Sequence, residues 1–230
     1  SEMCIRDSGS GSVKRLSMDC KATVKLGAFS RGGQTRGEHR ASDHDFGSPG
    51  KYIPCGIVDE DSGELFLSFG SSYKTSDFIV DTLESWWAQR SEAEQNAFDQ
   101  IQLKIDNGPE SSGVRTQFLH RLVEFADTIG KPIQLLYYPP YHSKYNPIER
   151  CWGILEQHWN GSQLVDVETM LEWAHTMTWK GLHPIVELSH KLYQKGISLS
   201  KSAMRAVEAR LQRNPLLPKW DILIRPAVAN

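Results

Sequence analysis

Apolar and polar residues alternate with a period of two near the start of the chain. The apolar positions of this alternation are Leu16, Met18, Cys20, Ala22, Val24 and Leu26. The pattern predicts one half-buried strand over 16–26, or two strands joined by a bend. Apolar runs at 55–58 and 64–69 flank the turn-forming stretch 59–63, which predicts a β-hairpin.

After residue 75 the apolar spacing becomes helical. Helices are predicted over 76–90, with Ser76 as the cap, over 115–129 and from Pro147 onward, with short strands at 101–105 and 133–138 between them. Further helices are predicted near 165–176, 184–194 and 200–213. Strands that alternate with helices favour parallel pairing, whereas the hairpin favours antiparallel pairing. We therefore expect an α/β fold with a mixed sheet and helices on both faces.

The chain divides into three predicted regions. Residues 1–12 are rich in Ser and Gly and lack periodicity, which is typical of a tag, a scar or a truncated junction. Residues 13–160 form the predicted α/β core, within which 29–54 should be a long irregular loop. Residues 161–230 form a predicted helical C-terminal extension.

Composition narrows the class of protein. Hydrophobic residues make up 39% of the chain, and no apolar run approaches the roughly 20 residues of a membrane helix. The 4 cysteines contain no CxxC pair, which argues against a zinc knuckle and a disulfide framework. We expect a cytoplasmic protein in a reducing setting, with no membrane partner.

The formal net charge is −2, but the segment 14–40 holds seven basic and two acidic residues. Arg31, Arg36 and Arg40 in this segment are candidates for contacts with nucleic-acid phosphates. The alternative is a solvated loop. The compact cluster 43–45, Asp-His-Asp, is a metal candidate or part of the same solvated loop.

Three carboxylates occupy positions typical of a site. Asp19 lies on the polar face of the first strand, Asp106 ends a later strand, and Glu149 lies in the first turn of the helix that follows the next strand. Ligands of such sheets gather outside the carboxyl ends of parallel strands, so the three should converge there. A set of hard oxygen ligands suits two Mg²⁺ or Mn²⁺ ions and phosphodiester chemistry.

Each carboxylate also has a structural interpretation. Asp19 can be a polar residue on a solvated strand face, and Asp106 precedes Asn-Gly as turn formers often do. Asn146-Pro147-Ile148-Glu149 reads as N-cap to N3 of a capping box. Glu149 is therefore either a helix-capping residue or a site residue.

Three sequence blocks together resemble a known family. They are Met18-Asp19-Cys20-Lys21, Asp106-Asn107-Gly108-Pro109-Glu110, and the stretch from Tyr137 to Trp152 that contains Pro-Pro-Tyr-His-Ser and Asn-Pro-Ile-Glu. They resemble the acidic blocks of bacterial insertion-sequence DDE transposases, more narrowly the ISAzo-type group. The resemblance runs from about Leu16 to Trp220.

This resemblance implies a ribonuclease H-like fold and a catalytic, metal-binding triad of Asp19, Asp106 and Glu149 that holds two divalent ions. It implies cleavage and strand transfer of DNA by a homodimer or larger assembly on terminal inverted repeats and target DNA, in the bacterial cytoplasm at the nucleoid. His142 and Lys144, in the loop before Glu149, are further candidates for DNA contact.

One departure from the family concerns the N-terminus. Such transposases usually carry a helix-turn-helix region before the first acidic strand, and here too few residues precede that strand. We therefore expect a fragment. Two alternatives stay open, an inactive relic that only binds DNA or a protein partner, and another ribonuclease H-like nuclease such as a junction resolvase.

Overall fold

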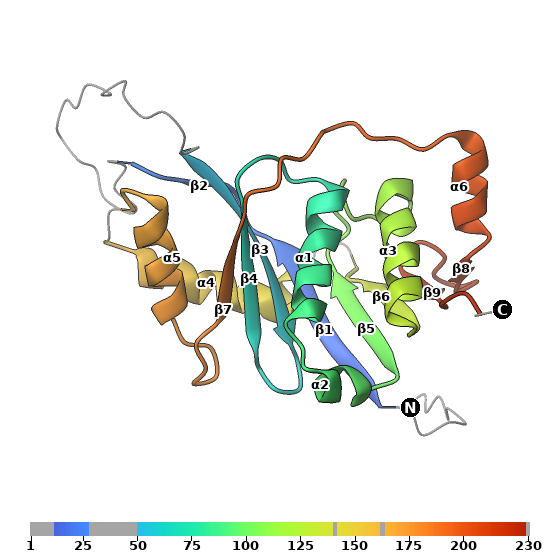
Figure 1. Ribbon diagram of the computed structural model, residues 1–230, viewed down its shortest axis with the longest axis horizontal. Helices are drawn as coiled ribbons and strands as arrows, with labels where there is room; N and C mark the ends of the chain where they lie inside the picture. Colours follow the sequence, from blue (N-terminus) through green and yellow to red (C-terminus); the bar gives the residue numbers. More distant parts are fainter. Residues whose placement is uncertain (1–11, 28–49, 140–141, 162–163, 229–230) are drawn as a thin grey trace.

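A computed structural model describes residues 12–27, 50–139, 142–161 and 164–228, and its strands form one sheet of nine. The sheet is ordered β7-β4-β3-β1-β5-β6-β9-β8, and β2 pairs with β3 (Figure 1). The strands are β1 (Val13–Cys20), β2 (Val24–Lys25), β3 (Lys51–Asp59), β4 (Leu65–Gly70), β5 (Gln100–Ile105), β6 (Ile133–Tyr137), β7 (Ile185–Ser189), β8 (Leu211–Arg213) and β9 (Asp221–Ile224).

The sheet is mixed, as predicted. Strands β1, β3 and β4 pair antiparallel, whereas β5 and β6 run parallel to β1. The predicted hairpin is therefore β3–β4. The first alternation is two strands, because β1 ends at Cys20 and β2 begins at Val24.

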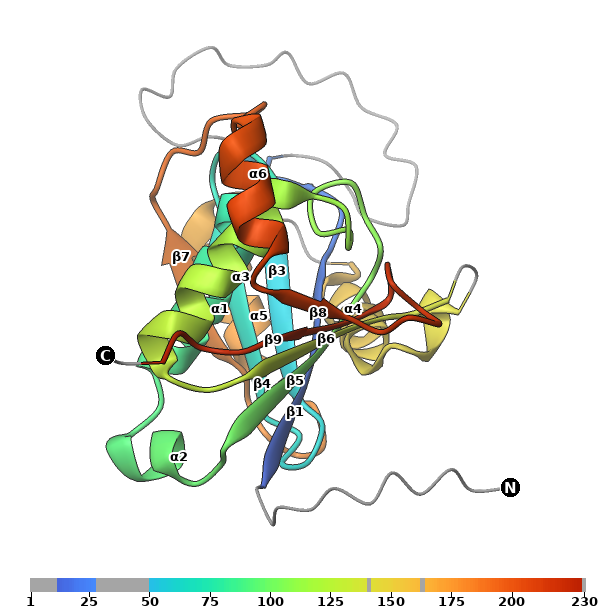
Figure 2. The same cartoon turned by 90° about the vertical axis from the view of Figure 1, so that its right-hand side faces the viewer.

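Helices cover both faces of the sheet. Figures 1 and 2 place α1 and α3 on one face and α4 on the other. Two buried clusters match this division, one between the sheet and α1 and α3, the other between the sheet and α4 and α5. The helices are α1 (Ser76–Ala88), α2 (Glu92–Asn96), α3 (Thr116–Ile129), α4 (Pro147–Trp159), α5 (Val167–Thr176) and α6 (Lys201–Glu208), with a short 3₁₀ turn η1 (Ser143–Tyr145). The expected α/β architecture, a mixed sheet flanked by helices on both faces, is confirmed.

Local capping sets several helix ends. The Thr75 side chain accepts a hydrogen bond from the Phe78 amide at 3.1 Å, so Thr75, and not Ser76 as predicted, is the N-cap of α1. Gly130 adopts a left-handed conformation with φ 67° and ends α3, as the sequence predicts. Helix α4 begins with Asn146 as N-cap and Pro147 in its first turn.

The predicted helix over 184–194 is wrong. Residues Ile185–Ser189 form strand β7, which pairs in parallel with β4 from Phe66↔Ile185 to Gly70↔Ser189. The unpaired backbone edge of β4 supplies hydrogen-bond partners that a helix here would leave unused, so tertiary pairing overrides the local pattern.

The predicted helix over 200–213 is correct only for its first part. Helix α6 ends at Glu208, and Leu211–Arg213 pairs with β9 as strand β8. The predicted irregular loop over 29–54 also ends early, because Lys51 already belongs to β3, and residues 28–49 lie outside the described part of the chain.

The division of the chain at residue 160 stays a prediction. The segment after it is helical only in part, and it supplies β7 at one edge of the sheet and β8 and β9 at the other (Figure 1). Among the described helices, none has the length and apolar character needed to cross a bilayer.

Strand β9 gives a test of whether this C-terminal segment belongs to the cooperative core. Ile222 is fully buried against β6 and its neighbours. Ile222→Ala should lower the free energy of unfolding by about 2–5 kcal/mol, because it leaves a cavity in the main core. Urea unfolding followed by circular dichroism measures the change.

Leu216 provides the control, since it is 88% exposed in the same segment. Leu216→Ala should leave the unfolding midpoint unchanged. Equal stability of Ile222→Ala and the parent protein would show that β9 is peripheral.

Candidate active site

Three carboxylates meet at the carboxyl ends of the central parallel strands. One oxygen each of Asp19, Asp106 and Glu149 lies within 4.8 Å of the others. The predicted convergence of these residues is therefore confirmed, and it spans three elements that are far apart in sequence.

Strand register explains the positions of two of them. Strands β1 and β5 are parallel, with Met18 opposite Ile105, so Asp19 and Asp106 follow at the same level of the sheet. Met18 and Ile105 point into the core beneath α1 and α3. Because side chains alternate along a strand, Asp19 and Asp106 point to the other face, where α4 packs.

The first turn of α4 supplies the third carboxylate. The Asn146 side chain is fully buried and accepts a hydrogen bond from the Ile148 amide at 3.3 Å, which fixes the start of the helix. One carboxyl oxygen of Glu149 lies within 4.8 Å of oxygens of Asp19 and Asp106. Asn146 is therefore the capping residue, and Glu149 is directed at the site.

Gly56 allows α4 to approach the sheet closely. It pairs with Asp19 across β1 and β3. A Cβ at this position would lie 2.7 Å from Ile148 Cδ1 and 2.8 Å from Trp152 Cη2, closer than atoms pack. The missing side chain thus makes room for the first turns of α4, and so for Glu149 beside Asp19.

Burial and mutual repulsion raise the pKa values of Asp19 and Asp106. Burial, together with the nearby charges of Asp106 and Glu149, raises the pKa of Asp19 to about 7. Burial and Glu149 also raise the pKa of Asp106, while the Lys74 ammonium group opposes that shift. Like charges held this close cost free energy unless a cation or a proton is present.

A cavity of about 250 Å³ opens beside the acids. Asp19 and Asp106 line it, together with Lys74, Cys20 and Ser111. Ser111 Oγ donates to the backbone carbonyl of Asp106 at 3.1 Å and holds the turn after β5.

The donor set fits divalent cations. All three groups are carboxylates, which suit hard ions such as Mg²⁺ and Mn²⁺. The Asp106 Oδ1 atom is buried and has no hydrogen-bond partner among the described residues. A cation would satisfy this orphaned oxygen and relieve the repulsion that raises the pKa of Asp19.

The other predicted site residues lie elsewhere. Arg31, Arg36 and Arg40 fall outside the described residues, as does the cluster 43–45. His142 and Lys144 are exposed, just before α4, and do not line the cavity beside the acids. Lys144 Nζ lies 5.3 Å from the centre of the Tyr145 ring.

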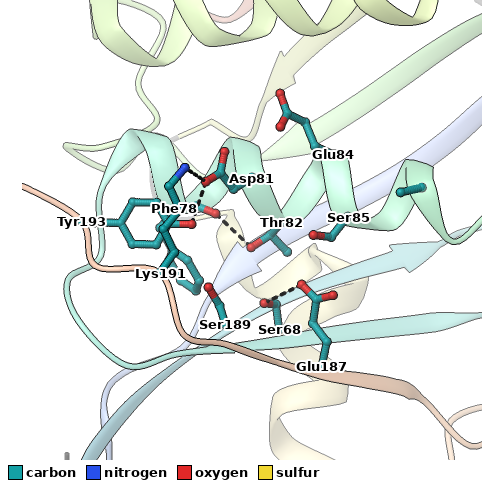
Figure 3. A pocket seen from close by; sticks show the side chains of 11 residues that line it. Ser68, Phe78, Asp81, Thr82, Glu84, Ser85, Glu187, Ser189, Lys191 and Tyr193 are labelled. Atoms are coloured by element: carbon teal, nitrogen blue, oxygen red, sulfur yellow. Dashed lines mark hydrogen bonds and ion pairs between the residues drawn. The ribbon is translucent and has the colours of Figure 1, made fainter.

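A separate cavity of about 390 Å³ lies between α1 and the chain around β7 (Figure 3). Its polar groups are largely engaged with one another. Asp81 accepts from Lys191 at 2.9 Å and from Tyr193 at 2.7 Å, and Ser68 donates to Glu187 at 3.1 Å. The bonds to Asp81 fasten the segment after β7 to α1, and the bond between Ser68 and Glu187 links β4 to β7.

Two residues of the site were not identified from sequence. An isolated glycine within a strand often marks close approach of another backbone, and that signal was present at Gly56. Lys74 gave no signal, because it lies in the turn after β4 and reaches the acids only through the fold.

Comparison with known proteins agrees with this geometry. Residues 5–226 match the family model described as the Rhodopirellula transposase DDE domain. A comparison with curated proteins gave no match.

Among solved structures, the fold is similar to a chain in the cryo-electron microscopy structure of the simian T-cell lymphotropic virus intasome in complex with PP2A regulatory subunit B56 gamma. The sequence identity is 15% and the TM-score is 0.45. The match covers 76% of this chain and 55% of that chain, so this chain spans about half the length of the chain it matches.

The raised pKa of Asp19 gives the metal-free protein a pH-dependent stability. A carboxyl group whose pKa rises from 3.8 to about 7 on folding stabilises the fold at low pH, and this contribution is lost as pH rises through about 7. Asp19→Asn cannot ionise, so it should be the more stable protein at pH 8 in a chelator. Urea unfolding between pH 5 and 8 measures the difference.

The exposed Asp99 serves as the control, and Asp99→Asn should keep the pH dependence of the parent. Added Mg²⁺ should raise the stability of the parent above pH 7 more than that of Asp19→Asn. Parallel pH profiles for the parent and Asp19→Asn would contradict the electrostatic account.

Gly56→Ala tests the close approach of α4. The new methyl group should displace Ile148 and Trp152, cost about 1–3 kcal/mol of stability, and move Glu149 away from Asp19. Affinity for Mn²⁺, measured by isothermal titration calorimetry, should fall about 10- to 100-fold.

Gly153 lies in the same helix, and a Cβ there would meet no atom within 4 Å. Gly153→Ala should therefore bind Mn²⁺ as the parent does. Unaltered Mn²⁺ affinity and stability in Gly56→Ala would show that α4 does not depend on this glycine.

Proposed function

Because this chain belongs to the transposase DDE domain family, we propose that it catalyses metal-dependent DNA cleavage and strand transfer at insertion-sequence ends, with Asp19, Asp106 and Glu149 as its catalytic residues. The observation that carries the proposal is their convergence, with oxygens within 4.8 Å of one another at the carboxyl ends of parallel strands. The family is one of polynucleotidyl transferases, and the proposal assigns the reaction to these three side chains.

The three carboxylates would hold two divalent ions, Mg²⁺ or Mn²⁺. When bound, such ions supply activation of an attacking oxygen and stabilisation of the leaving oxygen in phosphodiester chemistry. Asp19 and Asp106 contribute ligands from the rigid centre of the sheet, and Glu149 contributes one from α4. Full ionisation of Asp19, which its raised pKa opposes in the metal-free protein, accompanies cation binding.

The substrates in this proposal are terminal inverted repeats and target DNA, bound by a homodimer or larger assembly at the bacterial nucleoid. Arg31, Arg36 and Arg40 would add phosphate contacts from the basic segment, and His142 and Lys144 from the exposed turn before α4. Residues 13–160 would form the catalytic core and 161–230 its extension.

A pure DNA-binding relic is the less favoured function. A binding domain has no need of three converging acids, and acids oppose contact with phosphates unless cations are bound. Two observations support a cation-dependent site. Asp106 has a buried oxygen without a hydrogen-bond partner among the described residues, and the pKa of Asp19 is raised.

Asp106→Asn tests the proposed chemistry. The change removes a ligand charge with little change of shape, so cleavage and joining of DNA carrying the element ends should fall at least about 100-fold in Mg²⁺ or Mn²⁺. Gel analysis of labelled DNA measures both steps, and joined products distinguish a transposase from a simple nuclease.

Asp99→Asn is the matched control, because Asp99 is exposed on the turn before β5 and should retain parental activity. Circular dichroism should show that both variants are folded. Parental cleavage rates in Asp106→Asn would refute the assignment of the site.

A further inference from the structure

A basic cavity of about 310 Å³ adjoins the carboxylate site. It lies where α1 and α3 begin, and residues 194–197 close its outer side. Lys74 lines both this cavity and the one beside the acids. The turn after β5 separates the two, since Gly108 and Ser111 line the acidic cavity and Pro109 and Glu110 line the basic one.

The charge of the cavity is positive once its internal pairs are considered. Asp77 is bound by Arg121 at 2.6 Å and by the Gln117 side-chain amide at 3.0 Å. Glu110 lies 3.8 Å from Lys74. Arg115 Nη2 donates to the neutral Ile197 carbonyl at 3.4 Å, and no ion pair to a described carboxylate neutralises Arg115 or Lys195, so both positive charges are available to a ligand.

Two polar side-chain atoms at the cavity are buried without a hydrogen-bond partner among the described residues. Arg115 Nε is a buried donor with no acceptor among the described residues. Gln117 is 9% exposed, and its Oε1 atom is likewise buried and unpartnered. Arg115 is the N-cap residue of α3 and its side chain makes no capping hydrogen bond, so amides of the first turn lack an acceptor from that side chain. Buried polar groups left in this state cost free energy, which indicates that a ligand or water satisfies them.

We propose that this cavity binds a backbone phosphate of the DNA strand whose neighbouring nucleotide lies at the three acids. A phosphate provides acceptors for Arg115, Lys74 and Lys195 and suits the positive end of α3. A bridging water can donate to both the phosphate and Gln117 Oε1. Lys195 Nζ lies 4.2 Å from the centre of the Tyr73 ring, which holds this cation near the rim.

Adjacency to the acids favours DNA over a free anion. Phosphates recur at every nucleotide, so a strand that presents one phosphate to the acids must place others close by. Lys74 contacts both cavities and can bridge consecutive phosphates. This inference rests on the proposed function, because it assumes that the acids act on DNA.

Binding measurements without catalysis test the proposal. Fluorescence anisotropy of a short labelled duplex of element-end DNA would be recorded at several NaCl concentrations, in a chelator and in an Asp106→Asn background. Arg115→Gln and Lys195→Gln should each weaken binding and lower the salt slope by about one. Arg205→Gln, at an exposed arginine on α6, should retain the parental slope.

Replacing single phosphates by neutral methylphosphonates locates the contact. At one position near the cleaved bond, the substitution should weaken binding of the parent but cause no further loss in Arg115→Gln. The proposal would be overturned if Arg115→Gln and Lys195→Gln both kept the parental salt slope and both lost as much affinity as the parent at every methylphosphonate position. Lys195 is exposed, so its variant is informative even if Arg115→Gln fails to fold.

The outcomes separate the two proposals. Parental salt slopes in both cavity variants, with normal cleavage by the unmodified chain, would overturn the phosphate site alone. Reduced slopes without any cleavage by the unmodified chain would support the phosphate site and count against the catalytic function. No DNA binding by the unmodified chain would overturn both.

Discussion

Repulsion among three carboxylates is the constraint on which this structure depends. Asp19, Asp106 and Glu149 are held with oxygens within 4.8 Å of one another, and burial adds to the cost of their charges. Carboxylates stay this close together only where packing and hydrogen bonds of the surrounding fold hold their backbone positions fixed. Here two central parallel strands fix two acids, and a capped helix packed on the sheet at Gly56 fixes the third.

Packing on both faces of the sheet supplies the rigidity that this constraint requires. The core beneath α1 and α3 positions β1 and β5, while the core beneath α4 and α5 anchors the helix that carries Glu149. Lys74 links this acidic centre to the basic cavity at the start of α3. Charges of opposite sign thus lie next to each other, an arrangement suited to a polyanionic strand and the cations that accompany it.

Much of the site was accessible from sequence. Period-two alternation placed Asp19 and Asp106 on the polar side of their strands, and the position of Glu149 after the next strand placed it at the same edge. The alternation is a local pattern and says nothing about distances between strands. Because the carboxyl ends of parallel strands lie at one edge of the sheet, acids placed at those ends are expected to lie close together. The local signal left the direction of the Glu149 carboxyl group open, because Asn146-Pro147-Ile148-Glu149 is also a good helix start. The tertiary structure places this group beside Asp19 and Asp106.

The sequence by itself therefore determined the mixed sheet, its main helices and which three acids lie together at one edge of the sheet, because short-range periodicity and a specific motif encode them. Tertiary structure alone decided that 185–189 forms a strand on β4, that Leu211–Arg213 pairs with β9, and that Lys74 reaches the acids. It also revealed why position 56 holds glycine. These features depend on contacts between residues distant in the chain, and the free energy of such contacts is not expressed in any local pattern.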